Sequence, residues 1–393
     1  MLKDVEVYIF NPEHDMALAN FSSYYKAPSE IIRMKDDLSF LPFWFSPDNA
    51  LIKVYDKVMI QVLKNQTSSF GDISHSRFVD CFTSSVIVPW GWDPAIVHSL
   101  VESGISSTVL PGKEELENIR FLSSRERAAE VLESFSSVAG LCGKAFRCTD
   151  IIHVKDVIAS HDDVILKSPW SGSGRGLVRI SRDAWNANTE GWVSRIIRTQ
   201  GCIMAEPIYN KVLDFAMEFY SDDDGNMSFV GYSLFDTDSH GNYKHNILIG
   251  DNDIEKKICL YVPLQILHQV RDRLLKELQS IVAGGYSGYF GVDMMICSEG
   301  NGFLLHPCVE INLRMNMGVV SHIIYDRFVS RLSSGRFVIE HFASDGEALS
   351  AHGHLSISHP LTIDDEGKIS SGYLTLTPVV HSTRYQAYII ILE

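Results

Sequence analysis

Short runs of apolar and polar residues in the N-terminal part of the chain alternate in a way that predicts strands separated by helices. Residues 4–10 and 86–88 predict two strands, and residues 108–110 predict a third. Apolar residues at helical spacing occupy positions 96–101, between the second and third of these strands. Because strands and helices alternate, the pattern predicts a parallel, doubly wound α/β layer over residues 1–118.

The rest of the chain has the pattern of mixed α+β subdomains. Apolar residues repeat at helical spacing over residues 263–282. Two strand-like runs, residues 288–297 and 303–313, are joined by a glycine-containing turn that is typical of a hairpin. After the N-terminal layer we expect a small subdomain at residues 119–205, a larger one at 206–335 and a mixed C-terminal segment at 336–393 that packs on the core.

The stretch from Val164 to Ile180 joins a strand-like run, a loop of small residues and a second strand-like run. Lys167 ends the first run, and glycines in the loop can adopt positive φ and bring main-chain N–H groups close to an anion. The loop residues that offer donors or backbone freedom are Ser171, Gly172, Ser173, Gly174, Arg175 and Gly176. They predict a phosphate-binding loop, while a plain turn between two strands is the alternative.

The predicted hairpin carries a second chemical pattern. Glu310 and Asn312 are two positions apart, so on a strand both side chains point to one face. Asp293, on the neighbouring strand, can share that face. Two carboxylates and an amide oxygen suit Mg²⁺, and Arg314, two positions further on, can neutralise phosphate charge. The alternative is that these carboxylates only decorate a solvent-facing strand.

Charge and cysteine content narrow the class of function. The chain has 34 Lys and Arg against 49 Asp and Glu, a formal net charge of −15, so the basic surface of a nucleic-acid-binding protein is missing. Asp4 and Glu6 interrupt what would have to be the apolar core of a signal peptide, and no run is long enough for a membrane helix. Seven widely spaced cysteines without a C-x-x-C pair indicate reduced thiols. We therefore expect a cytoplasmic protein that binds neither nucleic acid nor membrane.

These features follow one another in a specific order over roughly residues 120–335. The ordered set is Lys167 with the glycine-rich loop, Glu206 at the end of a short strand, Asp214, and then Asp293, Glu310 and Asn312. In this order the chain resembles the ATP-grasp superfamily. The resemblance implies an α/β protein in which an N-terminal parallel layer precedes two α+β subdomains that grip ATP.

The resemblance also implies roles for single residues at the nucleotide. Lys167 would contact both the base and the phosphates of ATP, and the segment from Ser171 to Gly176 would close over the triphosphate. Glu206 would lie at the hinge between subdomains, where the backbone of Pro207 and Ile208 would bind the adenine edge. Asp214 would bind the ribose in place of a longer glutamate.

At the reacting end, Asp293, Glu310 and Asn312 would hold Mg²⁺ or Mn²⁺, and Arg314 would lie beside the reacting carboxylate. A second phosphate-binding cation is expected at Arg125, although Arg120 and Arg127 compete for that place. Lys244 could reach the γ-phosphate. An exposed basic residue without such a role is the alternative for both Arg125 and Lys244.

The activity implied by the resemblance is ATP-dependent activation of a small-molecule carboxylate, followed by attack of an amine or thiol. A kinase of the same fold and a non-catalytic nucleotide-binding protein are the alternatives. The oligomeric state has no signal in the sequence, so a homodimer stays open. Each alternative would use the same nucleotide site.

Substrate choice would lie with the N-terminal layer and with residues 315–318. In the N-terminal layer the candidates are Glu13, His14 and residues 90–93. The stretch around Glu13 also has a local interpretation, in which Asn11 is the N-cap of a helix that starts at Pro12. Its position after a strand equally suits a ligand site at the carboxyl edge of the sheet.

Overall fold

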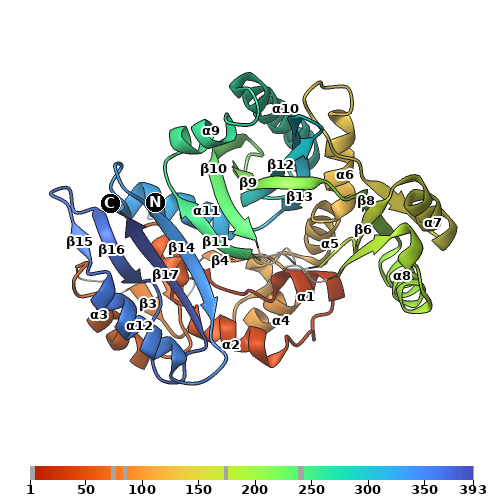
Figure 1. The fold of residues 1–393 in the computed structure, drawn as a ribbon. Coiled ribbons are helices and arrows are strands. Elements are labelled where there is room, and N and C mark those ends of the chain that lie inside the picture. Colours follow the sequence, from red (N-terminus) through yellow and green to blue (C-terminus); the bar gives the residue numbers. More distant parts are fainter. Residues whose placement is uncertain (1–4, 72–76, 83–85, 172–175, 238–242, 393) are drawn as a thin grey trace.

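The computed structural model describes residues 5–71, 77–82, 86–171, 176–237 and 243–392. Three sheets organise this part of the chain: a four-stranded sheet near the N-terminus, a second four-stranded sheet, and a nine-stranded sheet (Figure 1). The helices are α1 (His14–Asn20), α2 (Ser29–Asp37), α3 (Val58–Gln66), α4 (Pro94–Glu102), α5 (Lys113–Leu122), α6 (Arg125–Ser134), α7 (Ile151–Ser160), α8 (Ala187–Gln200), α9 (Asp251–Ile258), α10 (Leu264–Val282), α11 (Met317–Phe328) and α12 (Glu347–Ser358). Within the described ranges, none of these helices has both the length and the apolar character needed to cross a membrane.

The N-terminal sheet is parallel, as the alternation of strands and helices predicts. Its strands are β1 (Glu6–Ile9), β2 (Leu51–Lys53), β3 (Phe78–Val79) and β4 (Val86–Pro89), in the order β3-β2-β1-β4. The prediction of a strand at residues 108–110 is wrong, because residues 107–109 form a 3-10 helix. The Ser106 hydroxyl accepts a hydrogen bond from the Thr108 N–H, and this local cap closes a turn instead of an extended strand.

The predicted start of the first helix is also wrong. Helix α1 begins at His14, and its N-cap position is Glu13, whose side chain makes no capping hydrogen bond. The Asn11 side chain instead donates 2.9 Å to the carbonyl of Gly91, beyond β4. A tertiary hydrogen bond between two strand ends therefore replaces the local cap that the sequence predicts at Asn11.

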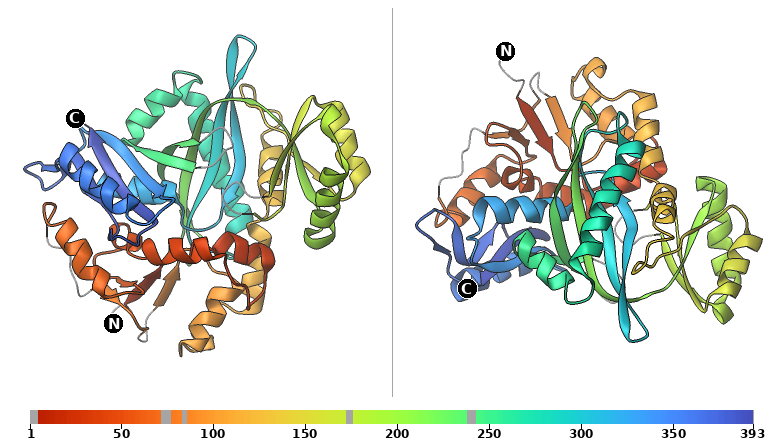
Figure 2. Two further views of the ribbon diagram at one scale, coloured as in Figure 1. Left: turned by 60° about the horizontal axis from the view of Figure 1, so that its bottom comes forward. Right: turned by 90° about the horizontal axis from the view of Figure 1, so that it is seen from above.

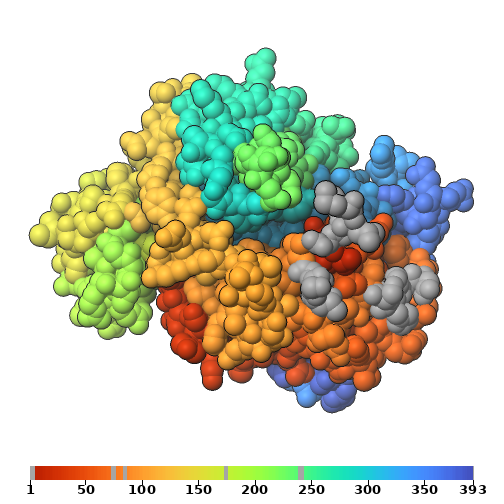
Figure 3. Space-filling view, turned by 180° about the vertical axis from the view of Figure 1, so that it is seen from behind, coloured from red at the N-terminus to blue at the C-terminus, as the bar shows by residue number. Residues whose placement is uncertain are grey.

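The second sheet forms a separate lobe. Its strands are β5 (Phe146–Cys148), β6 (Asp163–Lys167), β7 (Leu177–Ser181) and β8 (Ile203–Pro207), in the antiparallel order β5-β8-β6-β7. Helices α7 and α8 cover it, and α8 ends at Gly201, which has φ of 87°. Figure 2 shows this lobe standing out from the rest of the molecule, and Figure 3 shows it as a protrusion at one end.

The large sheet is antiparallel throughout and continues to the C-terminal part of the chain. Its strands are β9 (Asn210–Ser221), β10 (Met227–Thr237), β11 (Tyr243–Leu248), β12 (Gly288–Glu299), β13 (Gly302–Asn312), β14 (Ser334–His341), β15 (Thr362–Ile363), β16 (Ile369–Thr375) and β17 (Tyr385–Leu392). Because β14 pairs with β11, the segment after residue 335 extends this sheet and forms no separate layer.

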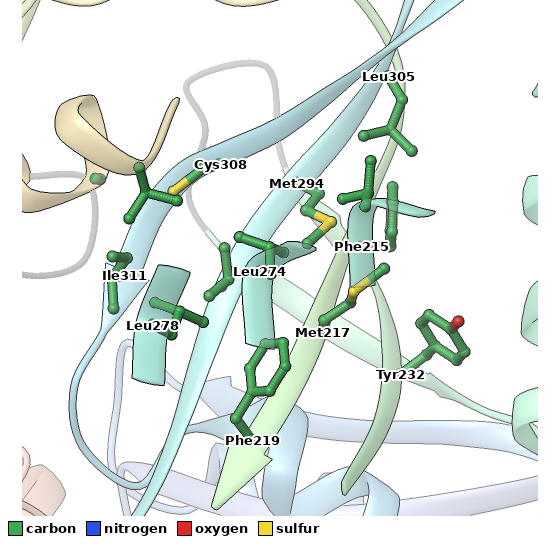
Figure 4. Close-up of a cluster of buried hydrophobic side chains, with 14 of the residues drawn as sticks. Phe215, Met217, Phe219, Tyr232, Leu274, Leu278, Met294, Leu305, Cys308 and Ile311 are labelled. Carbon is green, nitrogen blue, oxygen red and sulfur yellow. The ribbon is translucent and has the colours of Figure 1, made fainter. Parts of the chain in front are cut away.

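Helix α10 covers one face of the large sheet with the apolar stripe that the sequence predicts. Its buried side chains include Leu267, Leu274 and Leu278, which are inaccessible to solvent. Figure 4 shows Leu274 and Leu278 packed among side chains of β9, such as Phe215 and Phe219. Burial of each such side chain contributes about 1.5–3 kcal/mol to folding. This core holds β9, β12 and β13 rigidly, and the residues at one end of these strands form the pocket described next.

Candidate active site

A polar pocket of about 260 Å³ lies where the large sheet, the N-terminal layer and the glycine-rich loop meet. Its lining includes five of the residues singled out in the sequence: Arg125, Asp293, Glu310, Asn312 and Arg314. Ser171, at the start of the glycine-rich loop, lines it as well. Residues far apart in the chain therefore meet in one pocket, whereas Lys167, Glu206 and Asp214 of the ordered set are not part of its lining.

Asp293 and Glu310 are direct partners in the pairing of β12 with β13. Asn312 follows on the same face, and its Nδ2 donates 3.0 Å to Asp293 Oδ2. Burial, followed by the charge of Glu310, raises the pKa of Asp293 to about 8. Two close, half-buried carboxylates in the pocket wall repel each other, and a bound cation would relieve that repulsion.

Asp293, Glu310 and Asn312 form a donor set of two carboxylates and one amide. This set fits a hard cation that completes its coordination with water and phosphate oxygens. In the described part of the chain, no three or more His, Cys, Asp or Glu side chains are grouped so that they alone could hold a metal ion. A cation here would thus depend on the Asn312 oxygen and on substrate oxygens for its remaining ligands.

Arg314 is held by the N-terminal layer. Its Nε and Nη2 donate 2.6 and 2.7 Å to the two carboxylate oxygens of Asp15 on α1. Burial opposes ionisation of Asp15, but the Arg314 guanidinium holds the pKa of this carboxyl below its ordinary value. The next residue adds a main-chain link, because the Met315 N–H donates 3.0 Å to the carbonyl of Trp90. The N-terminal layer therefore sets the orientation of the Arg314 guanidinium in the pocket.

Arg125, at the start of α6, connects the loop to the proposed metal ligands. Its Nη2 donates 2.6 Å to Glu310 Oε1, and its Nη1 donates 2.7 Å both to Ser171 Oγ and to the Ser168 carbonyl. Ser124 caps the helix, which fixes the position of Arg125. The two arginines that compete for the same role have other partners. Arg120 donates hydrogen bonds to carbonyls of α1, and Arg127 forms an ion pair with Glu130.

Lys167 and Glu206 form a buried ion pair of 2.6 Å across the adjacent strands β6 and β8. Both side chains are about one tenth exposed or less. Pro207 ends β8, and the Ile208 N–H donates 3.0 Å to the Asp163 carbonyl. This N–H therefore already has a partner at the predicted hinge. Burial also lowers the pKa of His306 on β13 to about 3, so this imidazole is neutral.

Two further candidates lie outside the pocket lining. Asp214 pairs with Lys211 and accepts 2.9 Å from Thr237 Oγ1, and only the threonine lines the pocket. Lys244 is exposed on β11. In the glycine-rich loop, Gly176 has φ of 71°, as expected for a turn glycine. The predictions for Gly172, Ser173, Gly174 and Arg175 lie outside the described residues.

The residues expected to select substrate divide into two groups. Met317, Gly318 and Asn316 line the pocket. By contrast, Glu13 pairs with Lys35 of α2, and the buried His14 lies 3.4 Å from Asp93, the N-cap of α4. Trp90 packs against Phe10 in the hydrophobic core. These N-terminal side chains support the layer, and Asp15 is the residue of α1 that reaches the pocket.

The sequence analysis missed Glu218, which lines the same pocket from β9. It is 1% exposed, and burial raises its pKa to about 7 although Ser233 and Asn316 donate hydrogen bonds to it. The detectable signal was a lone acid inside the apolar run of residues 215–219. Asp15 lies in the stretch around Glu13 whose position after a strand suits a ligand site, but its pairing with Arg314, 299 positions away, had no signal in the sequence.

Comparison with known proteins gives matches in structure and none in sequence: no protein-family model and no curated protein matches the chain. Biotin carboxylase from Campylobacter jejuni matches over 100% of this chain and 88% of its own, with a TM-score of 0.52 and 12% identity. The biotin carboxylase domain of the Hydrogenobacter thermophilus 2-oxoglutarate carboxylase covers 100% of this chain and 87% of its own, with a TM-score of 0.51 and 13% identity.

An N5-carboxyaminoimidazole ribonucleotide synthetase matches over 100% of this chain and 93% of its own, with a TM-score of 0.50 and 14% identity. Matches at such low sequence identity show a similar fold, and they do not assign roles to single residues of this chain. The matched enzymes are ATP-grasp proteins, and matches that cover 100% of this chain show that it has the ATP-grasp fold.

Proposed function

We propose that the chain is an ATP- and Mg²⁺-dependent ligase that activates a small-molecule carboxylate for attack by an amine. The observation that carries the proposal is the direct pairing of Asp293 with Glu310 in a pocket wall that also presents Asn312 and Arg314. Two matched structures support it, because they are named as complexes with βγ-ATP and with MgADP, ADP and bicarbonate. We infer a cytoplasmic location from the widely spaced, unpaired cysteines.

Asp293, Glu310 and Asn312 would hold the metal ion, which when bound supplies charge neutralisation for the phosphates. The carboxylate oxygen attacks the γ-phosphorus, ADP leaves, and an acyl-phosphate is formed. Arg314, oriented by Asp15, neutralises charge at the reacting carboxylate. Arg125, from the start of α6, and Lys167, from the small lobe, hold phosphate oxygens. Few groups need to move a proton in this first step, so positioning and charge carry it.

At the other end of the nucleotide, Lys167 and Glu206 would flank the base at the hinge, with Pro207 and Ile208 at the adenine edge and Asp214 at the ribose. The segment from Ser171 to Gly176 would cover the triphosphate and Lys244 would reach it from β11. We also propose the division at residues 118, 205 and 335 as the functional one, with the nucleotide between the second and third units. A homodimer is the proposed assembly, as one matched structure is named as a dimer.

A co-substrate screen tests the proposal. The chain is incubated with ATP, Mg²⁺ and pools of small carboxylates that include bicarbonate, each with and without pooled amines, and phosphate and ADP are measured. A ligase releases phosphate only when both a carboxylate and an amine are present, or releases it faster with both. ADP formation with a phosphorylated product and one co-substrate would instead show a kinase. Binding of MgATP without turnover in any pool would show a nucleotide-binding protein.

A further inference from the structure

The carboxyl group of Glu218 is buried in the pocket wall among neutral hydrogen-bond donors. Ser233 Oγ donates 2.7 Å to Oε1, and Asn316 Nδ2 donates 3.0 Å to Oε2. Among the described residues no salt bridge to Glu218 is formed. A buried carboxylate without a cationic partner costs free energy, so a chain retains one at a site of this kind when its charge is used.

Two glycines make room for this carboxyl group. A Cβ at Gly318 would lie 2.0 Å from Glu218 Oε1, and a Cβ at Gly291 would lie 2.5 Å from Oε2. Gly291 is also the direct partner of Glu218 in the pairing of β12 with β9. The carboxyl therefore occupies a niche that an ordinary side chain at either position would close, and both Gly318 and Glu218 line the pocket.

A purely structural role does not require a carboxylic acid at this place. Asn316 is the N-cap of α11, where its Oδ1 accepts 3.0 Å from the Val319 N–H, and Glu218 holds the other end of that amide. The amide oxygen of a glutamine could accept the same hydrogen bond from Asn316 at a lower desolvation cost. Anchoring of α11 thus explains the hydrogen bond from Asn316 to Glu218, but it does not explain why residue 218 is an acid and not an amide.

The surroundings of the Glu218 carboxyl on balance disfavour its charged form. The charged groups that face Glu218 are Asp293 on β12 and Arg314 beyond β13, while β10 and the start of α11 contribute the neutral Ser233 and Asn316. Burial raises the pKa of Glu218 to about 7 against these donors. A general base is most effective when its pKa lies near the working pH.

We propose that Glu218 is the proton acceptor for the amine in the second step of the reaction, an inference that rests on the proposed ligase function. The amine enters as an ammonium ion and gives one proton to the Glu218 carboxylate. Its freed lone pair forms the C–N bond at the acyl carbon. The C–O bond to phosphate breaks, its electron pair leaves on the phosphate, and the phosphate takes the second nitrogen proton. The products are the amide, hydrogen phosphate and protonated Glu218, which returns its proton to solvent.

Hydroxylamine separates this step from the first one. It is largely unprotonated at neutral pH, so it can trap an acyl-phosphate as a hydroxamate without a proton acceptor. Wild type and Glu218→Gln are compared with MgATP and the carboxylate–amine pair identified by the screen above, and then with hydroxylamine in place of the amine. We expect the variant to lose about 100-fold more of its amide formation than of its hydroxamate formation.

Equal losses in both reactions, or no loss in either, would overturn the proposal while leaving the ligase function standing. A wild-type chain that turns over no pair and forms no hydroxamate would overturn the ligase function, and this inference with it. Ser233→Ala covers the case in which Glu218→Gln fails to fold. Ser233→Ala removes one hydrogen-bond donor to the carboxylate and so raises the pKa of Glu218 further. Amide formation at neutral pH should therefore fall about 3- to 10-fold and recover as the pH rises. Hydroxamate formation should show neither the fall nor the recovery. A pH-independent loss would contradict the proposal.

Discussion

The Arg125 guanidinium lies 2.6 Å from the Glu310 carboxylate, between residues 185 positions apart in the sequence. Arg125 also donates to Ser171 Oγ at 2.7 Å, so one side chain joins a proposed metal ligand to the first residue of the glycine-rich loop. In the absence of a metal ion this arginine neutralises Glu310. Metal and nucleotide binding would therefore have to compete with an existing ion pair.

Glu310→Gln should abolish Mg²⁺-dependent turnover, with a loss of at least about 100-fold, because an amide is a far weaker ligand for a hard cation than a carboxylate. The glutamine can still accept the hydrogen bond from Arg125 but no longer neutralises this buried guanidinium, so the chain should stay folded with a loss of about 1–3 kcal/mol of unfolding free energy. Turnover is measured as a function of Mg²⁺ concentration. Glu299→Gln, at an exposed position of β12, is the matched control. Unchanged activity in the Glu310 variant would rule out the metal assignment.

Asp15→Asn should lower turnover about 10- to 100-fold while nucleotide affinity stays within a few-fold, because Arg314 loses its bidentate partner and its orientation. It should also cost about 1–3 kcal/mol of unfolding free energy, since the arginine is left with a weaker partner in a partly buried place. Kinetics and calorimetric ADP binding measure the two effects separately. Glu13→Gln, two positions away and outside the pocket lining, is the control. A loss of ADP binding equal to the loss of turnover would contradict the role given to Asp15.

The raised pKa of Glu218 predicts a pH dependence of stability with a definite sign. The folded state binds this proton more tightly than the unfolded chain, so its stabilising effect is complete below the unfolded pKa of about 4.5 and is lost as the pH rises through about 7. The Glu218→Gln variant has no titrating carboxyl at this position, so its stability does not fall in this way as the pH rises. Relative to wild type, the variant should therefore gain roughly 3 kcal/mol between acid and alkaline pH.

Urea unfolding of both proteins across this pH range measures the difference, in which groups common to both chains largely cancel. Glu340→Gln, which removes a half-buried glutamate that accepts 2.8 Å from Tyr388 in the C-terminal part of the sheet, is a control for a carboxylate outside the pocket. A difference between wild type and Glu218→Gln that does not vary with pH would show that this carboxyl titrates normally.

Lys167→Met should weaken ATP binding at least about 10-fold and destabilise the chain by about 3 kcal/mol, because it leaves Glu206 buried without its cation. The double variant Lys167→Met/Glu206→Leu should be more stable than Lys167→Met alone, since no uncompensated charge is left. Denaturant unfolding of the full cycle measures the coupling. The exposed pair Lys155–Glu190 provides the matched comparison, with an expected coupling much smaller than that of the buried pair because water screens the two charges. Additive effects at Lys167 and Glu206 would contradict a buried pair.

Much of the site could be predicted because its signals are local. The two-residue spacing of Glu310 and Asn312 determines a shared face on any strand, and the hairpin after Asp293 brings the first carboxylate opposite. Lys167 ends its strand as expected, and Pro169, two positions on, has no N–H to continue the ladder. One error arose where a tertiary contact replaced a local one, at Asn11, whose side chain bonds the backbone beyond β4 and leaves α1 without its predicted cap. The other, at residues 108–110, arose from a local cap at Ser106 that closes a turn.

The sequence by itself determined the parallel layer, the antiparallel hairpin and the order of the residues proposed for the nucleotide site, because hydrophobic periodicity and turn residues act over a few positions. Only the tertiary structure decided which charges meet. Asp15 reaches Arg314, Arg125 reaches Glu310, and Glu218 fills the niche beside Gly318, all through contacts between distant segments. Such pairings depend on how rigid elements pack, and a buried charge acquires its partner and its pKa from that packing and not from its neighbours in the chain.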